Sequence, residues 1–398
     1  MLAYLLLCLA LVAQFDACPI NERSKRQITK MYPLWPGGTV PYSYLPNTAK
    51  SNIDDVEAAI KYISENTCIK FERNADCKMN CLQITDANGC HGEIGIARYV
   101  ASKFSYNGAT CEGVNSAIHE FMHTLGIYHE HQRSDRDGFI TVAMNKIPTG
   151  PAMVPQYSQQ WHTHNYSPFE YGSIMMYSVE KSFNAIQPLD QKWKETLGNR
   201  RTPTFYDISR INRAYYCHDT RYFCKLASPL NCKNGGYMNP GTCDKCICPR
   251  GFGGKLCDDK PSEKTTPLKA STSFQPATVD FKNVNSPYSY IWITAPPNKY
   301  IEVRVKDIKI SETNDDTCSK GSVEVKYMDD PRITNPIQCT ATNKILKSVR
   351  NPLIIELYQR NAGTSSVTIE YRHSSDSFKT NLTTNGYDTD FKYQSSGN

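Results

Sequence analysis

The segment from His119 to His129 constrains the fold of this chain more than any other, because its histidine spacing and its glycine predict a specific local geometry. It reads His-Glu-Phe-Met-His-Thr-Leu-Gly-Ile-Tyr-His. Apolar residues at positions 118, 121, 122 and 125 predict a helix over 117–125, and Gly126 is the residue type that most readily ends a helix. On this helix His119 and His123 lie on one face, about 6 Å apart along the axis.

A third histidine completes a pattern that is typical of metal binding. Gly126 allows the chain to reverse sharply, which brings His129 back toward the first two histidines. Three protein ligands and one open solvent position are typical of a catalytic zinc site. We therefore expect one Zn²⁺ in this domain, bound by His119, His123 and His129, with Glu120 as the general base. Chance histidines on a surface helix are the alternative, which the glycine and the third histidine disfavour.

The sixteen cysteines of this 398-residue chain indicate an oxidising compartment. Residues 1–17 contain an apolar stretch, Leu2–Val12, which has the length of a signal peptide and is shorter than the roughly 20 residues that span a bilayer. No later segment is apolar enough to cross a membrane. We therefore expect a secreted, extracellular protein without a transmembrane segment.

The basic tetrapeptide Arg23-Ser24-Lys25-Arg26 predicts a second cleavage. It would define residues 18–26 as a short propeptide and Gln27 as the mature N-terminus. A solvated run of charge is the alternative. Cysteine parity favours cleavage, because removal of Cys8 and Cys18 leaves fourteen cysteines, an even number.

The charge of the chain argues against nucleic acid as a partner. The formal net charge of +6 is small for this length, and Lys and Arg form no long run. We expect a mildly basic, solvated surface and no binding to nucleic acid.

The chain divides into blocks by composition. Six cysteines fall within 224–257, a Pro-, Ser-, Thr- and Lys-containing joint follows, and 272–372 is rich in Val, Ile, Tyr and Thr. We expect an N-terminal domain over 27–217, a cysteine-rich module over 220–258, a linker over 259–271, a strand-rich module over 272–373 and a disordered tail over 374–398.

Two further motifs carry a resemblance to a known family. The third histidine continues as Glu130-His131-Gln132-Arg133-Ser134-Asp135-Arg136-Asp137, and Ser173-Ile174-Met175-Met176-Tyr177 has the form of a Met-turn. Together with Leu34-Trp35-Pro36, Val40-Pro41-Tyr42 and the closing segment Ile208–Cys217, they make residues 32–217 resemble the astacin family of metzincin zinc endopeptidases.

The resemblance implies roles for single residues. Met175 is an apolar floor beneath the metal, Tyr177 is a weak metal ligand that swings to the scissile carbonyl, and Glu130 anchors the trimmed N-terminal amine. The chain departs from the family in having Met176 where His is usual, and in lacking the F-x-G-D stretch that blocks the zinc. Cys18 could instead block the zinc as a thiolate ligand, or it could have no such role and merely lie near the signal cleavage site.

The resemblance also implies the architecture. We expect a multidomain chain with an α+β metzincin catalytic domain, built on a twisted five-stranded sheet with long helices. A small disulfide-rich EGF-like module and an all-β CUB sandwich follow. Cys77–Cys81 is expected from local spacing, and the six cysteines of 224–257 allow fifteen pairings, among which the resemblance chooses. The expected disulfides are Cys68–Cys217, Cys90–Cys111, Cys77–Cys81, Cys224–Cys243, Cys232–Cys246, Cys248–Cys257 and Cys318–Cys339.

The expected activity is hydrolysis of peptide bonds in extracellular matrix proteins or secreted proproteins, with the EGF-like and CUB modules as the contact to a matrix partner. The substrate should bind extended along an edge strand, for which Ser102–Tyr106 is a candidate and a plain core strand the alternative. Asn165 and Asn381 are candidate glycosylation sites. The rival functions are a catalytically weak matrix-binding protein and a zinc hydrolase that does not act on peptides.

Overall fold

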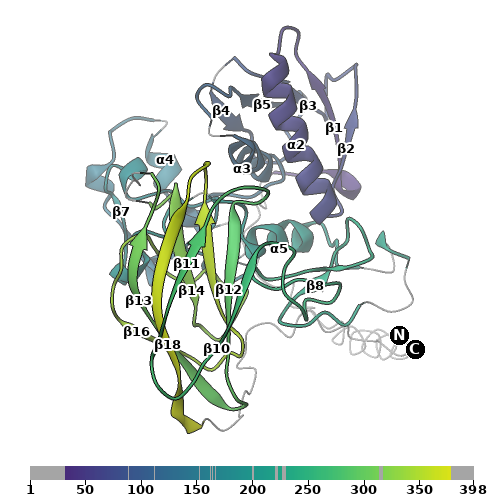
Figure 1. Cartoon of the computed structure of the whole chain (residues 1–398). Coiled ribbons are helices and arrows are strands. Elements are labelled where there is room, and N and C mark those ends of the chain that lie inside the picture. Colours follow the sequence, from purple (N-terminus) through teal and green to yellow (C-terminus); the bar gives the residue numbers. More distant parts are fainter. Residues whose placement is uncertain are drawn as a thin grey trace, which may run out of the picture.

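The computed structural model describes residues 32–377, apart from 88, 112, 152, 162, 164, 166, 200, 220–222, 226–229 and 313–316. The expected signal peptide and propeptide, Gln27 and Asn381 lie outside the described residues. Three units follow one another along the chain (Figure 1). They are an N-terminal domain (32–217), a cysteine-rich segment (223–257) and a β-sandwich (265–377).

A five-stranded sheet with the order β2-β1-β3-β5-β4 forms the upper part of the N-terminal domain. Its strands are β1 (Thr39–Tyr44), β2 (Lys70–Arg73), β3 (Leu82–Thr85), β4 (Cys90–Gly92) and β5 (Ser102–Tyr106). All neighbours run parallel except β4, which lies antiparallel to β5. The expectation that Ser102–Tyr106 is an edge strand is therefore wrong, because β3 and β4 pair with it on both sides. The edge strands are β2 and β4, and β4 is the edge that lies beside α3.

Two long helices, α2 (Lys50–Asn66) and α3 (Val114–Thr124), pack with this sheet around one core. The apolar positions of α2 recur at helical spacing, and Val56, Ala59, Ile60 and Ile63 are buried. Phe121 of α3 stacks on Phe104 of β5, with ring centroids 4.4 Å apart. Helix α3 is buried along most of its length, so the side chains that it carries are held in fixed positions.

The rest of the N-terminal domain consists of short elements and a third helix, α5 (Phe205–Ala214), which begins with a capping box between Thr204 and Asp207. The short elements are the 3₁₀ helices η1 (Pro36–Gly38), η2 (Glu130–Gln132), η3 (Arg136–Gly138), η4 (Met144–Lys146), η5 (Glu180–Ser182) and η6 (Gln191–Trp193), the helix α4 (Met153–Tyr157), and the strands β6 (Ile140–Val142) and β7 (Ile186–Pro188).

Disulfides hold the cysteine-rich segment, which contains only two short strands, β8 (Tyr237–Met238) and β9 (Cys246–Ile247), among its described residues. Across the chain the structure brings together all seven expected cysteine pairs. They are Cys68–Cys217, Cys77–Cys81, Cys90–Cys111, Cys224–Cys243, Cys232–Cys246, Cys248–Cys257 and Cys318–Cys339.

The β-sandwich consists of two sheets, with the orders β10-β12-β17-β14-β15 and β11-β18-β13-β16. Their strands are β10 (Thr265–Lys269), β11 (Gln275–Phe281), β12 (Tyr288–Thr294), β13 (Lys299–Lys309), β14 (Gly321–Lys326), β15 (Ile337–Gln338), β16 (Ile345–Ser348), β17 (Leu353–Gln359) and β18 (Ser365–Ser377). Alternate residues of the strands fill the core between the sheets.

Two expected boundaries need correction. Part of the expected linker 259–271 is strand β10, which pairs in parallel with β12. Its composition reads as a linker because it contains Pro267, but proline is tolerated on an edge strand such as this one. The start of the expected tail is also ordered, since β18 continues to Ser377.

The sandwich packs against the other two units through its first sheet. Glu356 on β17 meets Arg201 of the N-terminal domain, with 2.8 Å between oxygen and nitrogen, and Arg250 of the cysteine-rich segment at 3.5 Å. Beside them, the Tyr206 hydroxyl on α5 donates to Asp330 at 2.8 Å. Figure 1 shows α5 next to the sandwich. The three units therefore share buried contacts.

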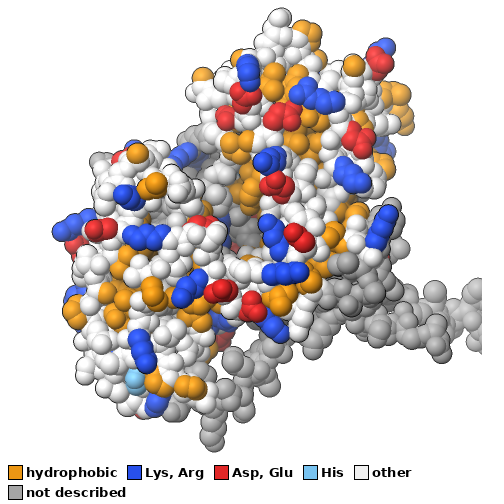
Figure 2. Space-filling view, turned by 45° about the vertical axis from the view of Figure 1, so that its right-hand side comes forward, with side chains coloured by type: hydrophobic (Ala, Val, Ile, Leu, Met, Phe, Trp, Pro, Cys, Tyr) orange, Lys and Arg blue, Asp and Glu red, His pale blue; other side chains and the backbone are white. Residues whose placement is uncertain are grey.

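Acidic and basic side chains alternate over the face shown in Figure 2, without a large patch of one sign. Among the described residues, no helix combines the length and apolar character that crossing a membrane requires.

Candidate metal centre

The three expected ligands converge on one point. His129 Nε2 lies 3.1 Å from His123 Nε2 and 3.3 Å from His119 Nε2. The ligand atoms of all three side chains lie within 4.8 Å of one another. His119 and His123 are buried, and His129 is half-buried. Three imidazoles from two elements of the chain thus face one common position.

Backbone carbonyls fix the orientation of two of these rings. His119 Nδ1 donates to the carbonyl of Ile174 at 2.7 Å, and His123 Nδ1 donates to the carbonyl of Ile127 at 2.8 Å. A neutral imidazole that donates through Nδ1 has its lone pair on Nε2, toward the shared position. Nε2 lone pairs that point toward one another at these distances repel, and a cation bound between them removes this repulsion. The donor set therefore fits the tetrahedral, nitrogen-rich coordination that zinc prefers.

The end of α3 explains why His129 returns to the site. Gly126 has a φ of 92°, a left-handed conformation that glycine adopts without steric cost. Its N–H donates to the backbone carbonyl of His123 at 2.7 Å, and the N–H of Ile127 donates to the backbone carbonyl of Met122 at 2.9 Å. These bonds close the helix and reverse the chain. The same turn places the Ile127 carbonyl against the His123 ring.

Glu120 is 8% exposed and lies on α3 where the edge strand β4 crosses it. A Cβ atom on Gly92 of β4 would lie only 2.2 Å from the Glu120 carbonyl oxygen. Only a glycine allows the strand to approach the helix this closely. Gly92 was not predicted as a site residue, because the approach depends on the sheet order.

The expected Met-turn contacts the histidine cluster through the Ile174 carbonyl, which accepts from His119. Met175 is fully buried, and its carbonyl accepts from the N–H of Glu130 at 2.9 Å. This bond ties the turn to the residue that follows His129. Met176, where the family usually has His, is also fully buried and packs in the neighbouring apolar cluster with Tyr177.

Tyr177 lies beside the third ligand. Its ring centroid is 4.5 Å from that of His129 and 4.5 Å from that of His131, and its hydroxyl donates to Gln156 Oε1 at 3.4 Å. Burial lowers the pKa of His131 to about 3, so this ring is neutral. These tilted ring contacts place Tyr177 next to His129 and hence next to the metal position.

Glu130 is completely buried in a cluster of charged side chains. Its carboxylate meets Arg210 at 2.7 Å and Arg133 at 3.1 Å, and it accepts from the N–H of Glu170 at 2.8 Å. The expected partner, the amine of Gln27, lies outside the described residues. The roles of Arg210 and Glu170 were not predicted, because 80 and 40 residues separate them from Glu130.

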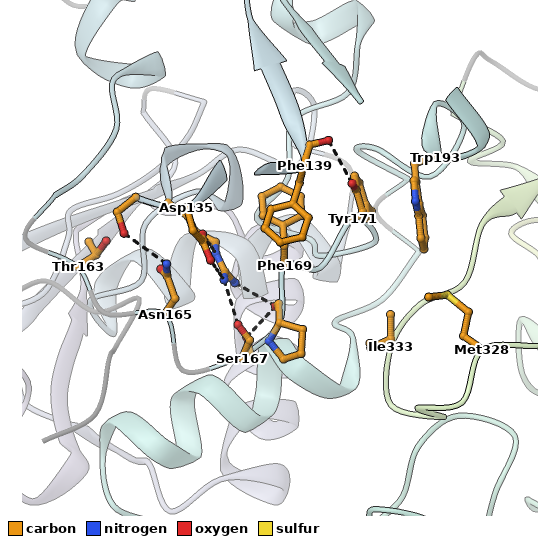
Figure 3. Close-up of a pocket in the computed structure, with 13 residues that line it drawn as sticks. Asp135, Phe139, Thr163, Asn165, Ser167, Phe169, Tyr171, Trp193, Met328 and Ile333 are labelled. Atoms are coloured by element: carbon orange, nitrogen blue, oxygen red, sulfur yellow. Dashed lines mark hydrogen bonds and ion pairs between the residues drawn. The ribbon is translucent and has the colours of Figure 1, made fainter. Parts of the chain in front are cut away.

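A cavity of about 640 Å³ lies next to this cluster, between the N-terminal domain and the sandwich (Figure 3). Phe139 and Phe169 stack along one wall, and Met328 and Ile333 of the sandwich lie across from them. Asn165 lines the cavity and its amide donates to Ser134 at 3.3 Å. Its glycosylation stays a prediction.

One other group in the described part of the chain has side chains close enough to hold a metal. It consists of Glu195, Cys318 and Cys339. The two cysteines are joined in a disulfide, so their sulfur atoms are not thiolate ligands. The histidine cluster is therefore the site with suitable donors.

Comparison with known proteins agrees with this chemistry. Residues 27–216 match the family model of astacin, a family of peptidases. The chain is 37% identical to zinc metalloproteinase nas-17 of Caenorhabditis elegans over 380 residues, which cover 92% of this chain and 85% of that protein. It is 34% identical to nas-24 of the same organism, over 89% of this chain and 90% of that protein.

A solved structure shows a similarity restricted to part of the chain. High choriolytic enzyme 1, a hatching-enzyme zinc protease of the medaka Oryzias latipes, matches 46% of this chain and 94% of its own, with 26% identity and a TM-score of 0.41.

Proposed function

Because this chain belongs to the astacin family of zinc metalloproteinases, we propose that it is a secreted endopeptidase that cleaves extracellular matrix proteins or secreted proproteins. The convergence of three imidazoles on one position carries this proposal. Seven disulfides in the described chain support an extracellular location.

His119, His123 and His129 would hold one zinc ion per catalytic domain. When bound, zinc supplies a Lewis acid that polarises the peptide carbonyl and lowers the pKa of water toward neutrality. The hydrogen bonds from Nδ1 of His119 and His123 keep these two side chains in the tautomer that binds metal.

Glu120 acts as the general base in this proposal. Its carboxylate takes a proton from the attacking water and delivers it to the leaving amine. Tyr177 donates its hydroxyl proton in a hydrogen bond to the oxyanion that forms at the scissile carbonyl. The 3.4 Å bond to Gln156 is long, so the Tyr177 hydroxyl can exchange partners at little cost.

The substrate binds extended against β4, which exposes one side of its backbone at the edge of the sheet. Because Gly92 has no side chain, this edge can lie directly against the backbone of Glu120. A peptide paired with β4 therefore lies next to the general base, whereas a peptide paired with the internal strand β5 would have to displace β4.

The cysteine-rich segment acts as an EGF-like module and the sandwich as a CUB-like module, which contact a matrix partner. The alternating pairing of Cys224–Cys243 and Cys232–Cys246, followed by Cys248–Cys257, supports the first assignment. The two antiparallel-rich sheets support the second. The first sheet of the sandwich is already covered by the rest of the chain, so its second sheet is the face that remains for a partner.

A casein-cleavage assay on the purified full chain, with and without a chelator, tests the proposal. The wild type should cleave casein, and the chelator should abolish cleavage. Glu120→Gln should retain zinc and lose nearly all activity. Glu65→Gln, which changes an exposed carboxylate on α2, is the matched control and should behave like the wild type. Near-normal cleavage by Glu120→Gln would rule out the mechanism.

A further inference from the structure

Both backbone polar groups of Ile174, its N–H and its carbonyl, are hydrogen-bonded to side chains. Its carbonyl accepts from Nδ1 of the metal ligand His119 at 2.7 Å. Its N–H donates to Oδ2 of Asp207 at 3.0 Å. The hydroxyl of Ser173 donates to Oδ1 of the same carboxylate at 2.5 Å. The N–H of Met175, which shares a peptide group with the Ile174 carbonyl, donates to Ser173 Oγ at 3.1 Å. A continuous line of hydrogen bonds therefore runs from Asp207 through the Ser173 hydroxyl and this peptide group to the metal ligand.

Asp207 is itself fixed in place. It is fully buried at the third position of α5, where the N–H of Thr204 donates to Oδ2 at 2.9 Å and Arg210 lies 3.4 Å from Oδ1. The N–H of Asp207 donates back to Thr204 Oγ1 at 3.2 Å. A carboxylate with this many donors has one orientation, and it transmits the position of α5 to the turn.

We propose that Asp207 is a positioning residue for the metal ligand His119, acting through the Ser173 hydroxyl and the Ile174–Met175 peptide group. The inference rests on the proposed function, because it assumes that His119 binds zinc. The Met175 N–H and the Ile174 carbonyl belong to one peptide group. The hydrogen bond of this N–H to the Ser173 hydroxyl, which itself donates to Asp207, strengthens the carbonyl oxygen as an acceptor, since hydrogen bonds in a chain polarise one another. The Ile174 carbonyl then holds the His119 ring more firmly in the metal-binding tautomer.

The geometry separates this role from a purely structural one. A residue that only stabilises α5 would change the free energy of unfolding without changing the affinity of the folded protein for metal. Asn212, on the same helix, offers that comparison, because its buried amide donates to Asn66 and Tyr237 and contacts neither the turn nor the histidines in the hydrogen bonds described.

The test is the zinc affinity of full-length Asp207→Asn, measured by competition with a chromophoric chelator. Replacing one oxygen by an NH₂ group sets a donor against the N–H groups that the carboxylate accepts. We expect zinc to bind about tenfold or more weakly, as for other changes behind a metal ligand. We also expect the visible absorption bands of the Co²⁺-substituted protein to shift. Asn212→Ala should lose stability and keep the wild-type affinity and Co²⁺ spectrum.

An affinity of Asp207→Asn within about twofold of the wild type would overturn the proposal, as would an equal loss of affinity in Asn212→Ala. Ser173→Ala provides a milder variant if Asp207→Asn does not fold. It removes one donor to the carboxylate, and it should weaken zinc binding several-fold; an unchanged affinity would again refute the role.

The affinity measurement does not depend on peptidase activity. A wild type that binds zinc tightly but cleaves no peptide would contradict the proposed function, and the affinities of the variants would still decide the role of Asp207. A wild type that cleaves peptides while Asp207→Asn binds zinc normally would contradict only the positioning role.

Discussion

Glu356→Gln should loosen the whole molecule, because this carboxylate is where the three units meet. Its side chain is fully buried, with Arg201 at 2.8 Å and Arg250 at 3.5 Å. Burial alone would raise the pKa of Glu356, but the positive charges of Arg250, Lys326 and Arg201 outweigh burial and lower it. The carboxylate is therefore ionised and balances two guanidinium groups from the other units, that of Arg201, which is buried, and that of Arg250, which is half-buried.

The expected loss in the free energy of unfolding follows from the charges that remain after the substitution. With Glu356 present, the buried cluster contains the carboxylates of Glu324 and Glu356 and the cations Arg201, Arg250 and Lys326. The substitution leaves one carboxylate among three cations. Breaking a buried ion pair by removing one partner costs about 3–5 kcal/mol, because the other charge stays desolvated. Glutamine preserves the volume, so no cavity contributes to this cost.

Urea unfolding of the full-length chain, followed by tryptophan fluorescence, measures the change in the free energy of unfolding. The matched control is Glu370→Gln, on the other sheet of the same sandwich. The Glu370 side chain is 32% exposed and lies 3.4 Å from Arg304. A partly exposed pair of this kind, open to water and screened by salt, contributes about 1 kcal/mol or less. If Glu356→Gln cost no more than Glu370→Gln, the buried cluster would not hold the units together.

Three further changes test other parts of the account. Tyr177→Phe should reduce kcat about 10²–10³-fold with KM nearly unchanged in peptide-cleavage kinetics, and an unaltered kcat would exclude oxyanion stabilisation by this hydroxyl. Gly92→Ala should destabilise the protein by about 1–3 kcal/mol and lower activity, because its Cβ meets the Glu120 carbonyl at 2.2 Å; Gly138→Ala, with no atom within 4 Å, should do neither in the same unfolding and cleavage assays. Burial, aided by Asp207, raises the pKa of Glu170 from 4.5 to about 8, so its neutral form favours the folded state. The free energy of unfolding should therefore fall as the pH rises from about 5 to about 8. In Glu170→Gln the urea midpoint should depend less on pH over this range, and an unchanged pH dependence would contradict this explanation.

Local patterns made the metal ligands predictable. His119 and His123 lie on one face of a helix because their spacing fits the helical repeat, and Gly126 marks the reversal that returns His129. Each of these inferences needs only neighbouring residues. The metalloproteinase family likewise followed from contiguous motifs, and comparison with known proteins confirms it.

Contacts between residues far apart in the sequence could not be predicted from these local patterns. β5 reads as a strand, but its position inside the sheet depends on β4, which comes before it in the chain and folds back beside it. Asp207 and Ile174 are 33 residues apart, and only the packing of α5 under the turn joins them. The structure shows that Asp207 completes the capping box that begins with Thr204, and that its carboxylate also binds the turn; neither role was predicted.

The most direct test of the central claim is elemental analysis of purified, proteolytically active protein. We predict one zinc ion per chain. Zinc and activity should be lost together on dialysis against a chelator, and both should return when zinc is restored. Full activity in protein that contains no transition metal would contradict the claim that His119, His123 and His129 form the catalytic centre.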